Sequence, residues 1–299
     1  MNLKTPLRYP GGKSRATVKL AQFLPDMEKI TYYREPFLGG GSVALYMTQR
    51  YPHLQVWVND LYLPLCVFWT VLRDNSKDLH RILKEYKTLH DTPESARELF
   101  NQMKVAIDNP KLGELDIAVA FYVINKCSFS GLTESSSFSA QASNSNFSMR
   151  GIDNIPEYSK IIQNWKITNY SYTRVMGNGQ DILIYLDPPY EIKDKLYGKS
   201  GNMHSGFNHD KFAGICQEHV EATKMLVSYN SSQLIRERFA GKWSPYEYDH
   251  TYTMRSVGDY MADQKNRKEL ALINYDIRPE LPTKGLSKNN KSNKTKSDA

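Results

Sequence analysis

The tetrapeptide Asp187-Pro188-Pro189-Tyr190 follows the apolar run at residues 182–186 and joins an acid, two prolines and an aromatic ring. Proline restricts the backbone and lacks an N–H donor, so the carbonyl oxygens of Asp187 and Pro188 can be held toward a pocket. The Asp187 carboxylate adds another acceptor, and Tyr190 adds a flat π-face. This set suits a planar ring with an exocyclic amino group, stacked on Tyr190 with its N–H groups bonded to fixed acceptors.

A glycine-rich loop at residues 35–42 reads Glu-Pro-Phe-Leu-Gly-Gly-Gly-Ser and lies between a predicted strand and a predicted helix. Glycine allows sharp turns and close approach of a ligand to the backbone. Asp60 ends the next predicted strand, where a carboxylate can accept hydrogen bonds from a ribose diol. Gly39-x-Gly41-x-x-Ala44 also fits the dinucleotide fingerprint. These residues favour a nucleoside cofactor without identifying it, and an ordinary strand–helix turn is the alternative.

A second glycine pair lies in the segment Tyr9-Pro10-Gly11-Gly12-Lys13-Ser14. It is not a P-loop, because Leu7 occupies the position at which that motif needs its first glycine. A helix N-terminus opened by glycines and bearing a lysine can nevertheless bind a carboxylate or a phosphate. A solvated lysine at a helix start is the simpler interpretation.

Strand-like and helix-like runs alternate around these motifs, which predicts an α/β fold with a mainly parallel sheet. Such sheets bind ligands at the carboxyl ends of their strands, so the loops after Phe37, Val58 and Leu186 should share one rim. The predicted strands are residues 30–33, 54–58, 165–168, 181–186, 225–229 and 269–275, and the predicted helices of this part are residues 13–24, 42–50, 210–223 and 233–239.

The middle of the chain has a different character. Amphipathic or apolar helical patterns at residues 65–72, 79–89, 94–107 and 115–124 are followed by a segment, residues 128–148, with nine serines, for which a loop or hairpin is expected. We therefore predict a mainly helical insertion at residues 61–154 within a discontinuous catalytic domain of residues 1–60 and 155–281. Residues 282–299 lack aromatics and are predicted to form a disordered basic tail.

Composition excludes several classes of protein. With 40% hydrophobic and 24% charged residues the chain is globular, and its apolar stretches are too short to span a membrane. Its three scattered cysteines fit neither a disulfide framework nor a zinc site, so we expect a cytoplasmic protein without a metal. The net charge of +7 suggests a polyanion partner, but five lysines and one aspartate after Leu281 supply +4 of it.

The ordered motifs resemble the Dam-like family of N6-adenine DNA methyltransferases, which use S-adenosylmethionine. The resemblance covers nearly everything except the tail. The matching segments follow one another in the family's order. They are residues 9–13, residues 35–42, Asp60, the segment Asn125 to Leu132, residues 187–190, Ser228-Tyr229-Asn230 and Arg267-Lys268-Glu269-Leu270. Tyr9 stands where relatives often have Trp. Residues 133–136 lack the arginine that GATC-recognising relatives carry, so the resemblance does not extend to GATC specificity.

The resemblance implies a Rossmann-like methyltransferase sheet with the insertion as target-recognition domain. It also implies site-specific, adenine-specific methylation of duplex DNA by a direct transfer, without metal, to the N6 amino group of a flipped-out base. The expected enzyme is a monomer, with a cognate restriction endonuclease as a candidate partner in a restriction-modification system. The implied catalytic residues are Asp187, Pro188 and Tyr190; the cofactor residues are Tyr9, Lys13, Glu35, Phe37, Gly39, Gly41, Asp60 and Asp187; the candidate DNA contacts are Arg8, Lys126, Ser130 and Arg150.

Three alternatives stay open at this point. A nicotinamide-dependent dehydrogenase would use the same glycine loop but leaves Asp187–Tyr190 without a role. A methyltransferase acting on cytosine N4 or on RNA would need the same acceptors. A non-catalytic DNA-binding protein on a methyltransferase scaffold would not need an intact acid, tyrosine and glycine loop.

Overall fold

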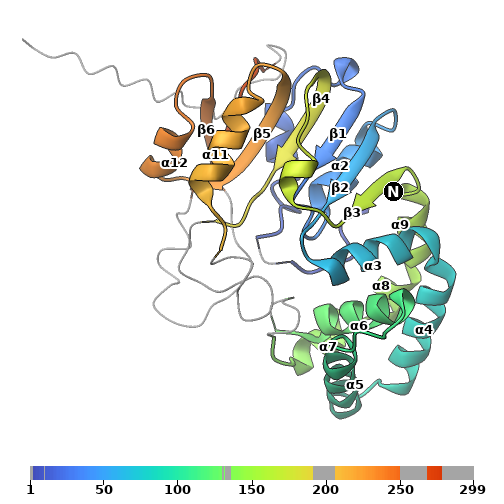
Figure 1. Cartoon of the computed structure of the whole chain (residues 1–299). Helices are drawn as coiled ribbons and strands as arrows, with labels where there is room; N and C mark the ends of the chain where they lie inside the picture. The colour runs from blue at the N-terminus through green and yellow to red at the C-terminus, as the bar shows by residue number, and fades with distance from the viewer. Residues whose placement is uncertain are drawn as a thin grey trace, which may run out of the picture.

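A computed structural model of the chain describes residues 3–9, 11–129, 131, 136–190, 206–249 and 268–277. The strands of this part form one seven-stranded sheet in the order β3-β2-β1-β4-β5-β7-β6 (Figure 1). The strands are β1 (Tyr32–Glu35), β2 (Gln55–Asn59), β3 (Trp165–Thr168), β4 (Gly179–Leu186), β5 (Thr223–Asn230), β6 (Ser244–Asp249) and β7 (Lys268–Ile273).

The first five strands pair in parallel, and β7 lies antiparallel between β5 and β6. The strand order reverses between β1 and β4, which is the topological switch point of a doubly wound sheet. The Rossmann-like fold class predicted from the sequence is therefore confirmed. The carboxyl ends of β1, β2 and β4 meet at this switch point, so the loops that follow them come together as expected.

Helices surround the sheet and fill the middle of the chain. The α-helices are α1 (Thr17–Leu20), α2 (Ser42–Arg50), α3 (Leu63–Asp74), α4 (Ser76–Leu89), α5 (Pro93–Ala106), α6 (Glu114–Cys127), α7 (Ala140–Ser145), α8 (Met149–Asp153), α9 (Ile155–Ile161), α11 (His209–Glu218) and α12 (Gln233–Arg238). Short 3-10 turns occur at η1 (Ala21–Phe23), η2 (Met27–Lys29) and η3 (Tyr172–Arg174). None of the described helices is long and apolar enough to cross a membrane.

Some predicted elements were wrong. The helix predicted over residues 13–24 is broken into α1 and η1. In the serine-rich segment Ser128 and Phe138 form an antiparallel bridge, in agreement with the predicted hairpin, but the segment also contains α7, because the Ser139 side chain accepts a hydrogen bond from the Ala142 N–H and caps a helix there. Strand β6 was missed, since Pro245 and charged residues weaken its pattern, although an edge strand tolerates proline. The predicted tail lies outside the described residues.

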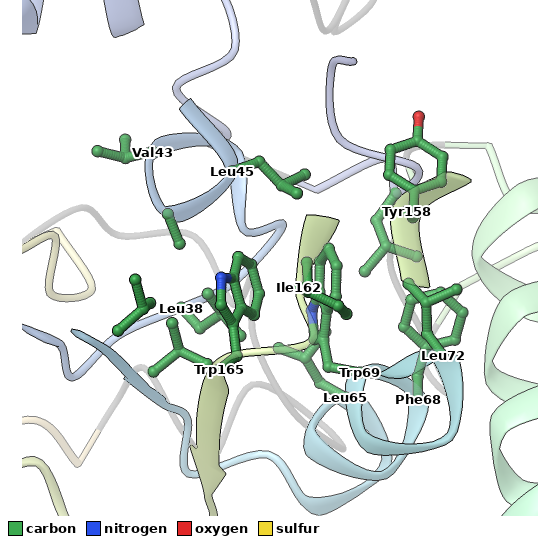
Figure 2. Close-up of a cluster of buried hydrophobic side chains, with 14 of the residues drawn as sticks. Leu38, Val43, Leu45, Leu65, Phe68, Trp69, Leu72, Tyr158, Ile162 and Trp165 are labelled. Atoms are coloured by element: carbon green, nitrogen blue, oxygen red, sulfur yellow. The ribbon is translucent and has the colours of Figure 1, made fainter. Parts of the chain in front are cut away.

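Two apolar clusters cover the two faces of the sheet. One joins residues of β1 and β2 to helices α2–α6 and α9, and the other packs β4, β5 and β7 against α11 and α12. In the first cluster, Trp69 of α3 and Trp165 of β3 are buried with ring centroids 5.3 Å apart (Figure 2). Helix α3 thus anchors the helical region to the sheet. The core is continuous across residue 61, and the division into two domains stays a prediction.

Candidate active site

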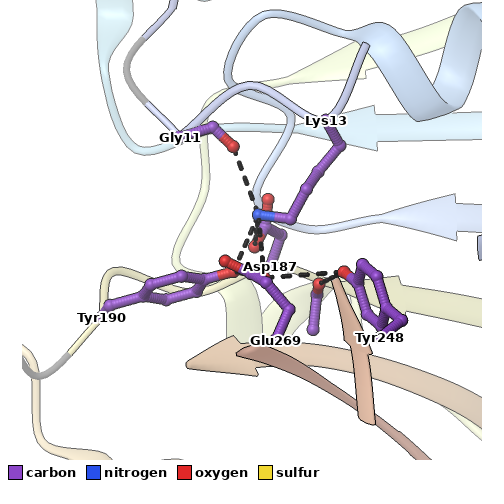
Figure 3. Close-up of polar contacts among 7 residues, drawn as sticks. Gly11, Lys13, Asp187, Tyr190, Tyr248 and Glu269 are labelled. Carbon is purple, nitrogen blue, oxygen red and sulfur yellow. Dashed lines mark hydrogen bonds and ion pairs between the residues drawn. The ribbon is translucent and has the colours of Figure 1, made fainter. Parts of the chain in front are cut away.

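Asp187 and Lys13 form the centre of the site. Asp187 directly follows β4, and Lys13 comes from the glycine-opened segment before α1. The Lys13 ammonium lies 2.9 Å from an Asp187 carboxylate oxygen and donates to the Tyr190 hydroxyl at 2.7 Å and to the Gly11 carbonyl at 3.2 Å (Figure 3). Two of the motifs singled out in the sequence, 174 residues apart, are therefore in direct contact.

A second carboxylate, Glu269, completes this cluster from β7. The Tyr190 hydroxyl donates to its Oε2 at 2.5 Å, and the Lys13 ammonium lies 3.8 Å from the same oxygen (Figure 3). The Tyr248 hydroxyl reaches that oxygen at 3.5 Å and lies 3.1 Å from the Ser228 hydroxyl. Lys13, Asp187, Tyr190 and Glu269 thus form one network of short polar contacts.

Burial controls the charges in this network. Lys13 is 3% exposed and Glu269 is 1% exposed. Burial alone would lower the pKa of the Lys13 ammonium, but the carboxylates of Asp187 and Glu269 outweigh it and raise that pKa above its ordinary value. Lys13 therefore carries its charge at neutral pH. Burial also raises the pKa of Glu269, because the ionised carboxylate is less stable away from water unless a cation balances its charge.

Close packing explains why two positions of the glycine loop are occupied by glycine. Gly41 has φ +67°, and a Cβ there would lie 2.6 Å from the Trp69 ring. Gly39 has φ +49°, and a Cβ there would lie 3.0 Å from the Tyr9 ring. Asp60 holds the turn, because its two carboxylate oxygens accept the Gly39 N–H at 2.9 Å and the Tyr62 N–H at 3.0 Å. The loop therefore contacts both Tyr9 and Asp60 at the ends of β1 and β2.

Glu35 ends β1, and Phe37 lies two residues later, before the turn at residues 39–40. Glu35 is 2% exposed, accepts the Tyr33 hydroxyl at 2.5 Å, and has a pKa raised well above its ordinary value by burial. The Phe37 ring stacks on Tyr172 with centroids 5.2 Å apart and packs against the aromatic side chains of the α11 face. The structure thus brings Glu35 toward Asp187, whose charge acts on it, whereas Phe37 faces the other apolar cluster.

Arg8 is fixed to the segment that follows α6. The Asn125 side chain accepts the Arg8 N–H at 3.0 Å and donates to the carbonyls of Arg8 at 2.6 Å and Gly131 at 2.9 Å. The Arg8 guanidinium donates to the carbonyls of Ser128 at 2.6 Å and Phe129 at 3.0 Å. Gly131 has φ +74° and lies so close to Arg8 that a Cβ would be 2.6 Å from it. This contact joins the N-terminal segment to the serine-rich one.

The other predicted DNA contacts differ in accessibility. Lys126, on α6, is 9% exposed, and its ammonium lies 5.3 Å from the centre of the Tyr122 ring. Burial, together with the charge of Arg8, lowers the pKa of Lys126 to about 8. Arg150, on α8, is exposed. Ser130 lies outside the described residues.

Two residues that contact candidate site residues were not assigned a role from the sequence. Asn125 and Glu269 both occur in the motifs that carry the family resemblance, but nothing local assigned them a role. The sequence feature that could have pointed to them is a charged or amide side chain in an otherwise apolar element. Asn125 follows a run of apolar residues in α6, and Glu269 precedes one in β7. Polar groups at such positions are normally paired.

Metal ligands were not expected from the sequence. Within the described ranges, no group of three or more His, Cys, Asp or Glu side chains is arranged to hold a metal ion. The three cysteines, Cys66, Cys127 and Cys216, are buried and free.

Comparisons with known proteins place these motifs in a family. The sequence pattern of the D12 class N6 adenine-specific DNA methyltransferases matches residues 9–254. The Type II methyltransferase M.MjaIII of Methanocaldococcus jannaschii is 25% identical over 296 residues, which cover 92% of this chain and 100% of the relative. The Type II methyltransferase M1.LlaDCHI of Lactococcus lactis subsp. cremoris is 21% identical over 291 residues, or 92% and 96% of the two chains.

Among solved structures, the rRNA methyltransferase aviRa from Streptomyces viridochromogenes aligns over 87% of this chain and 82% of its own, with a TM-score of 0.31 and 10% identity. The family match is the decisive finding, because it spans the Lys13 segment, the glycine loop and the Asp187 tetrapeptide together. The chain belongs to the D12 class of N6 adenine-specific DNA methyltransferases, and the network of Lys13, Asp187 and Tyr190 lies at the switch point of its sheet.

Proposed function

We propose that this enzyme methylates an adenine flipped out of duplex DNA at a specific sequence, with S-adenosylmethionine as the methyl donor. The observation that carries the proposal is the contact of Lys13, from one cofactor motif, with Asp187 and Tyr190 of the catalytic tetrapeptide. This contact joins the part of the site expected to hold the donor to the part expected to hold the base.

The charges of the site fit a cationic donor. The charge of Asp187 acts on both Glu35 and Glu269, while the Lys13 ammonium offsets the charges of Asp187 and Glu269. Burial raises the pKa of Glu35 and of Glu269, so an additional positive charge nearby would stabilise their ionised forms. S-adenosylmethionine carries a sulfonium and an ammonium and, when bound, supplies an electrophilic methyl group.

The remaining cofactor residues have distinct proposed roles. We assign the ribose to Asp60, and the amino-acid end of the donor to Lys13 and Glu35. Tyr9, Phe37, Gly39 and Gly41 shape the surrounding surface. Asp60 keeps acceptor capacity for this role, because the backbone N–H groups of Gly39, Tyr62 and Leu61 hydrogen-bond to its carboxylate, and a carboxylate has about four lone-pair sites.

Asp187 and Pro188 activate the base in this proposal. The lone pair of the adenine amino group is delocalised into the ring, which makes N6 a weak nucleophile. Hydrogen bonds from its N–H groups to the Asp187 carboxylate and the Pro188 carbonyl would localise that lone pair on N6. Correct placement of the amine beside the methyl group accounts for the rest of the acceleration.

Tyr190 is proposed to hold the flipped base. Its ring stacks on Tyr229, with centroids 5.7 Å apart and planes 23° apart, so an adenine would use the opposite face. Flipping costs a few kcal/mol, and base–aromatic stacking offsets about 1–3 kcal/mol of it.

The DNA is proposed to lie along the junction between the sheet and the inserted region, residues 61–154. Arg8 and Arg150 are the candidate contacts at its surface, Lys126 adds positive charge beneath it, and Ser130 belongs to the same segment by sequence. Arginine reads guanine or contacts phosphate, and serine bonds to base edges or phosphates. Residues 61–154 are the proposed target-recognition domain.

The Type II names of both relatives support a role in restriction and modification. We infer that the enzyme acts as a monomer and protects DNA from a cognate endonuclease with the same target. An endonuclease-challenge assay on DNA from cells that express the chain would test this protection.

The proposed reaction is tested by methylation-sensitive sequencing of DNA from cells that express the chain, which reports the base and its context together. We expect N6-methyladenine at one short sequence with the wild type and none with Asp187→Ala. Asp181→Ala, on the same strand but at its other end, is the matched control and should methylate normally. Methylated cytosine, or activity retained by Asp187→Ala, would refute the assignment.

A further inference from the structure

Glu269 is a buried carboxylate that the proposed chemistry at Asp187 does not use. It lies near the start of β7, opposite Tyr248 of β6 and Asn230 of β5, and is 1% exposed. Burying a carboxylate is unfavourable unless it is well hydrogen-bonded or paired. A 2.5 Å hydrogen bond from the Tyr190 hydroxyl connects it to the proposed base-stacking residue.

The Tyr190 ring is held at its edge and on one face. At the edge, its hydroxyl donates to Glu269 and accepts from Lys13 at 2.7 Å. On the face, the ring of Tyr229 stacks against it, and the Tyr229 hydroxyl is in turn hydrogen-bonded to His209. These two contacts together fix the plane of the Tyr190 ring before any base arrives.

Glu269 also interacts electrostatically with Lys13. Its Oε2 lies 3.8 Å from the Lys13 ammonium, on which Asp187 and Glu269 both act to favour the charged form. The same carboxylate therefore contacts the ring that would receive the base and the cation that contacts Asp187.

We propose that Glu269 is a positioning residue for methyl transfer: it fixes the Tyr190 ring in the orientation in which adenine stacks and keeps Lys13 beside Asp187. The inference rests on the proposed function. Glu269 touches neither base nor donor in this scheme and acts through Tyr190 and Lys13. Since transfer depends on placing the amine close to the methyl group, loss of this support should lower the rate of the chemical step more than binding.

The test compares Glu269→Ala with Glu269→Gln in steady-state methylation of DNA that carries the sequence found for the wild type. Glutamine keeps an oxygen that accepts the Tyr190 hydroxyl, whereas alanine does not. We expect Glu269→Ala to lower kcat about 10- to 100-fold, with the Kd for DNA and the KM for S-adenosylmethionine changed much less. Glu269→Gln should restore most of the lost kcat.

The matched control is Glu247→Ala. Glu247 is a carboxylate of the adjoining strand β6 that pairs with Arg236 and Lys268 rather than with Tyr190. Its loss should leave kcat unchanged even if the melting temperature falls. Equal losses of kcat in the two alanine variants, or a kcat for Glu269→Ala equal to that of the wild type, would overturn the inference.

Tyr190→Phe tests the same contact without opening a cavity, and it serves if Glu269→Ala does not fold. The variant keeps the ring and loses the hydroxyl, so kcat should fall with little change in DNA affinity. In a double-mutant cycle, the loss of kcat in the variant with both substitutions, expressed as a free energy, should be smaller than the sum of the losses in Tyr190→Phe and Glu269→Ala. Full activity of Tyr190→Phe refutes the positioning role. A wild type that does not methylate adenine refutes the proposed function instead.

Discussion

Lys126 offers a direct test of how charge is distributed at the junction of α6 with the N-terminal segment. Its side chain is 9% exposed, and its ammonium lies 5.3 Å from the centre of the Tyr122 ring. Burial and Arg8 lower its pKa from the ordinary 10.5 to about 8. This lowering corresponds to about 3 kcal/mol of destabilisation of the native state at pH 7, at about 1.4 kcal/mol for each tenfold change in proton affinity.

The sign of the pH dependence follows from the two pKa values. Below about pH 8 the lysine is protonated in both the folded and the unfolded chain, so the destabilisation is present in full. Between about pH 8 and 10.5 the unfolded chain binds more protons than the folded one, and stability rises with pH. By pH 10 only about 1 kcal/mol of the destabilisation should remain.

We therefore expect Lys126→Met to raise the free energy of unfolding by about 1–3 kcal/mol at pH 7, because methionine places an apolar thioether over the same ring. Urea unfolding at pH 7 and at pH 10 measures the effect, and the gain over the wild type should shrink at the higher pH. Lys160→Met is the control. Lys160 is exposed and pairs with Glu157, so its loss should change stability by less than about 0.5 kcal/mol.

The same variant separates folding from DNA binding. If Lys126 adds charge beneath the DNA surface, Lys126→Met should bind DNA more weakly and with a shallower salt dependence, by about one unit in the slope, while being more stable. A variant that is less stable at pH 7, or whose difference from the wild type is the same at both pH values, would refute the reasoning about the buried ammonium.

Three further predictions concern other contacts. Tyr190→Ala removes the proposed stacking surface and should lower kcat about 5- to 160-fold, equivalent to about 1–3 kcal/mol, whereas an unchanged rate in the methylation assay would exclude stacking. Asn125→Ala loses hydrogen bonds to Arg8 and Gly131 and should lower the free energy of unfolding by about 2–4 kcal/mol; urea unfolding beside the exposed Asn109→Ala measures this, and equal effects would contradict it. Removal of residues 282–299, which carry five lysines and one aspartate, should weaken DNA binding mainly at low salt, and a changed methylation sequence in the shortened enzyme would contradict a sequence-independent role.

Local patterns in the sequence were enough to predict the sheet and most of its strands. Strand β3 and helix α2 have the predicted bounds, because their hydrophobic periodicity is regular and their flanking residues end them clearly. Strand β6 was not predictable in this way, since it is an edge strand with little apolar character that is held by pairing with β7. Helix α7 depends on a serine cap within a segment whose composition is typical of loops.

Motifs predicted the candidate site but not its internal contacts. Asp187 and Tyr190 stand out because an acid, two prolines and an aromatic ring are adjacent. That Lys13 contacts Asp187, or that Tyr190 bonds to Glu269, depends on the path of a chain that separates these residues by 174 and 79 positions. Likewise, Asn125 shows its role only once Arg8 and Gly131 lie beside it.

The contact of Lys13 with Glu269 has a consequence for the order of events during synthesis. Their separation is 269 − 13 = 256 residues, which a ribosome adds in about 13–50 s at about 5–20 residues per second. A buried Lys13 would lack both carboxylate neighbours for the first 174 of these residues and would still lack Glu269 until the last is added, which disfavours docking of the N-terminal segment onto the nascent sheet. The site is therefore completed only when β7 has been made, and prematurely terminated chains should be inactive.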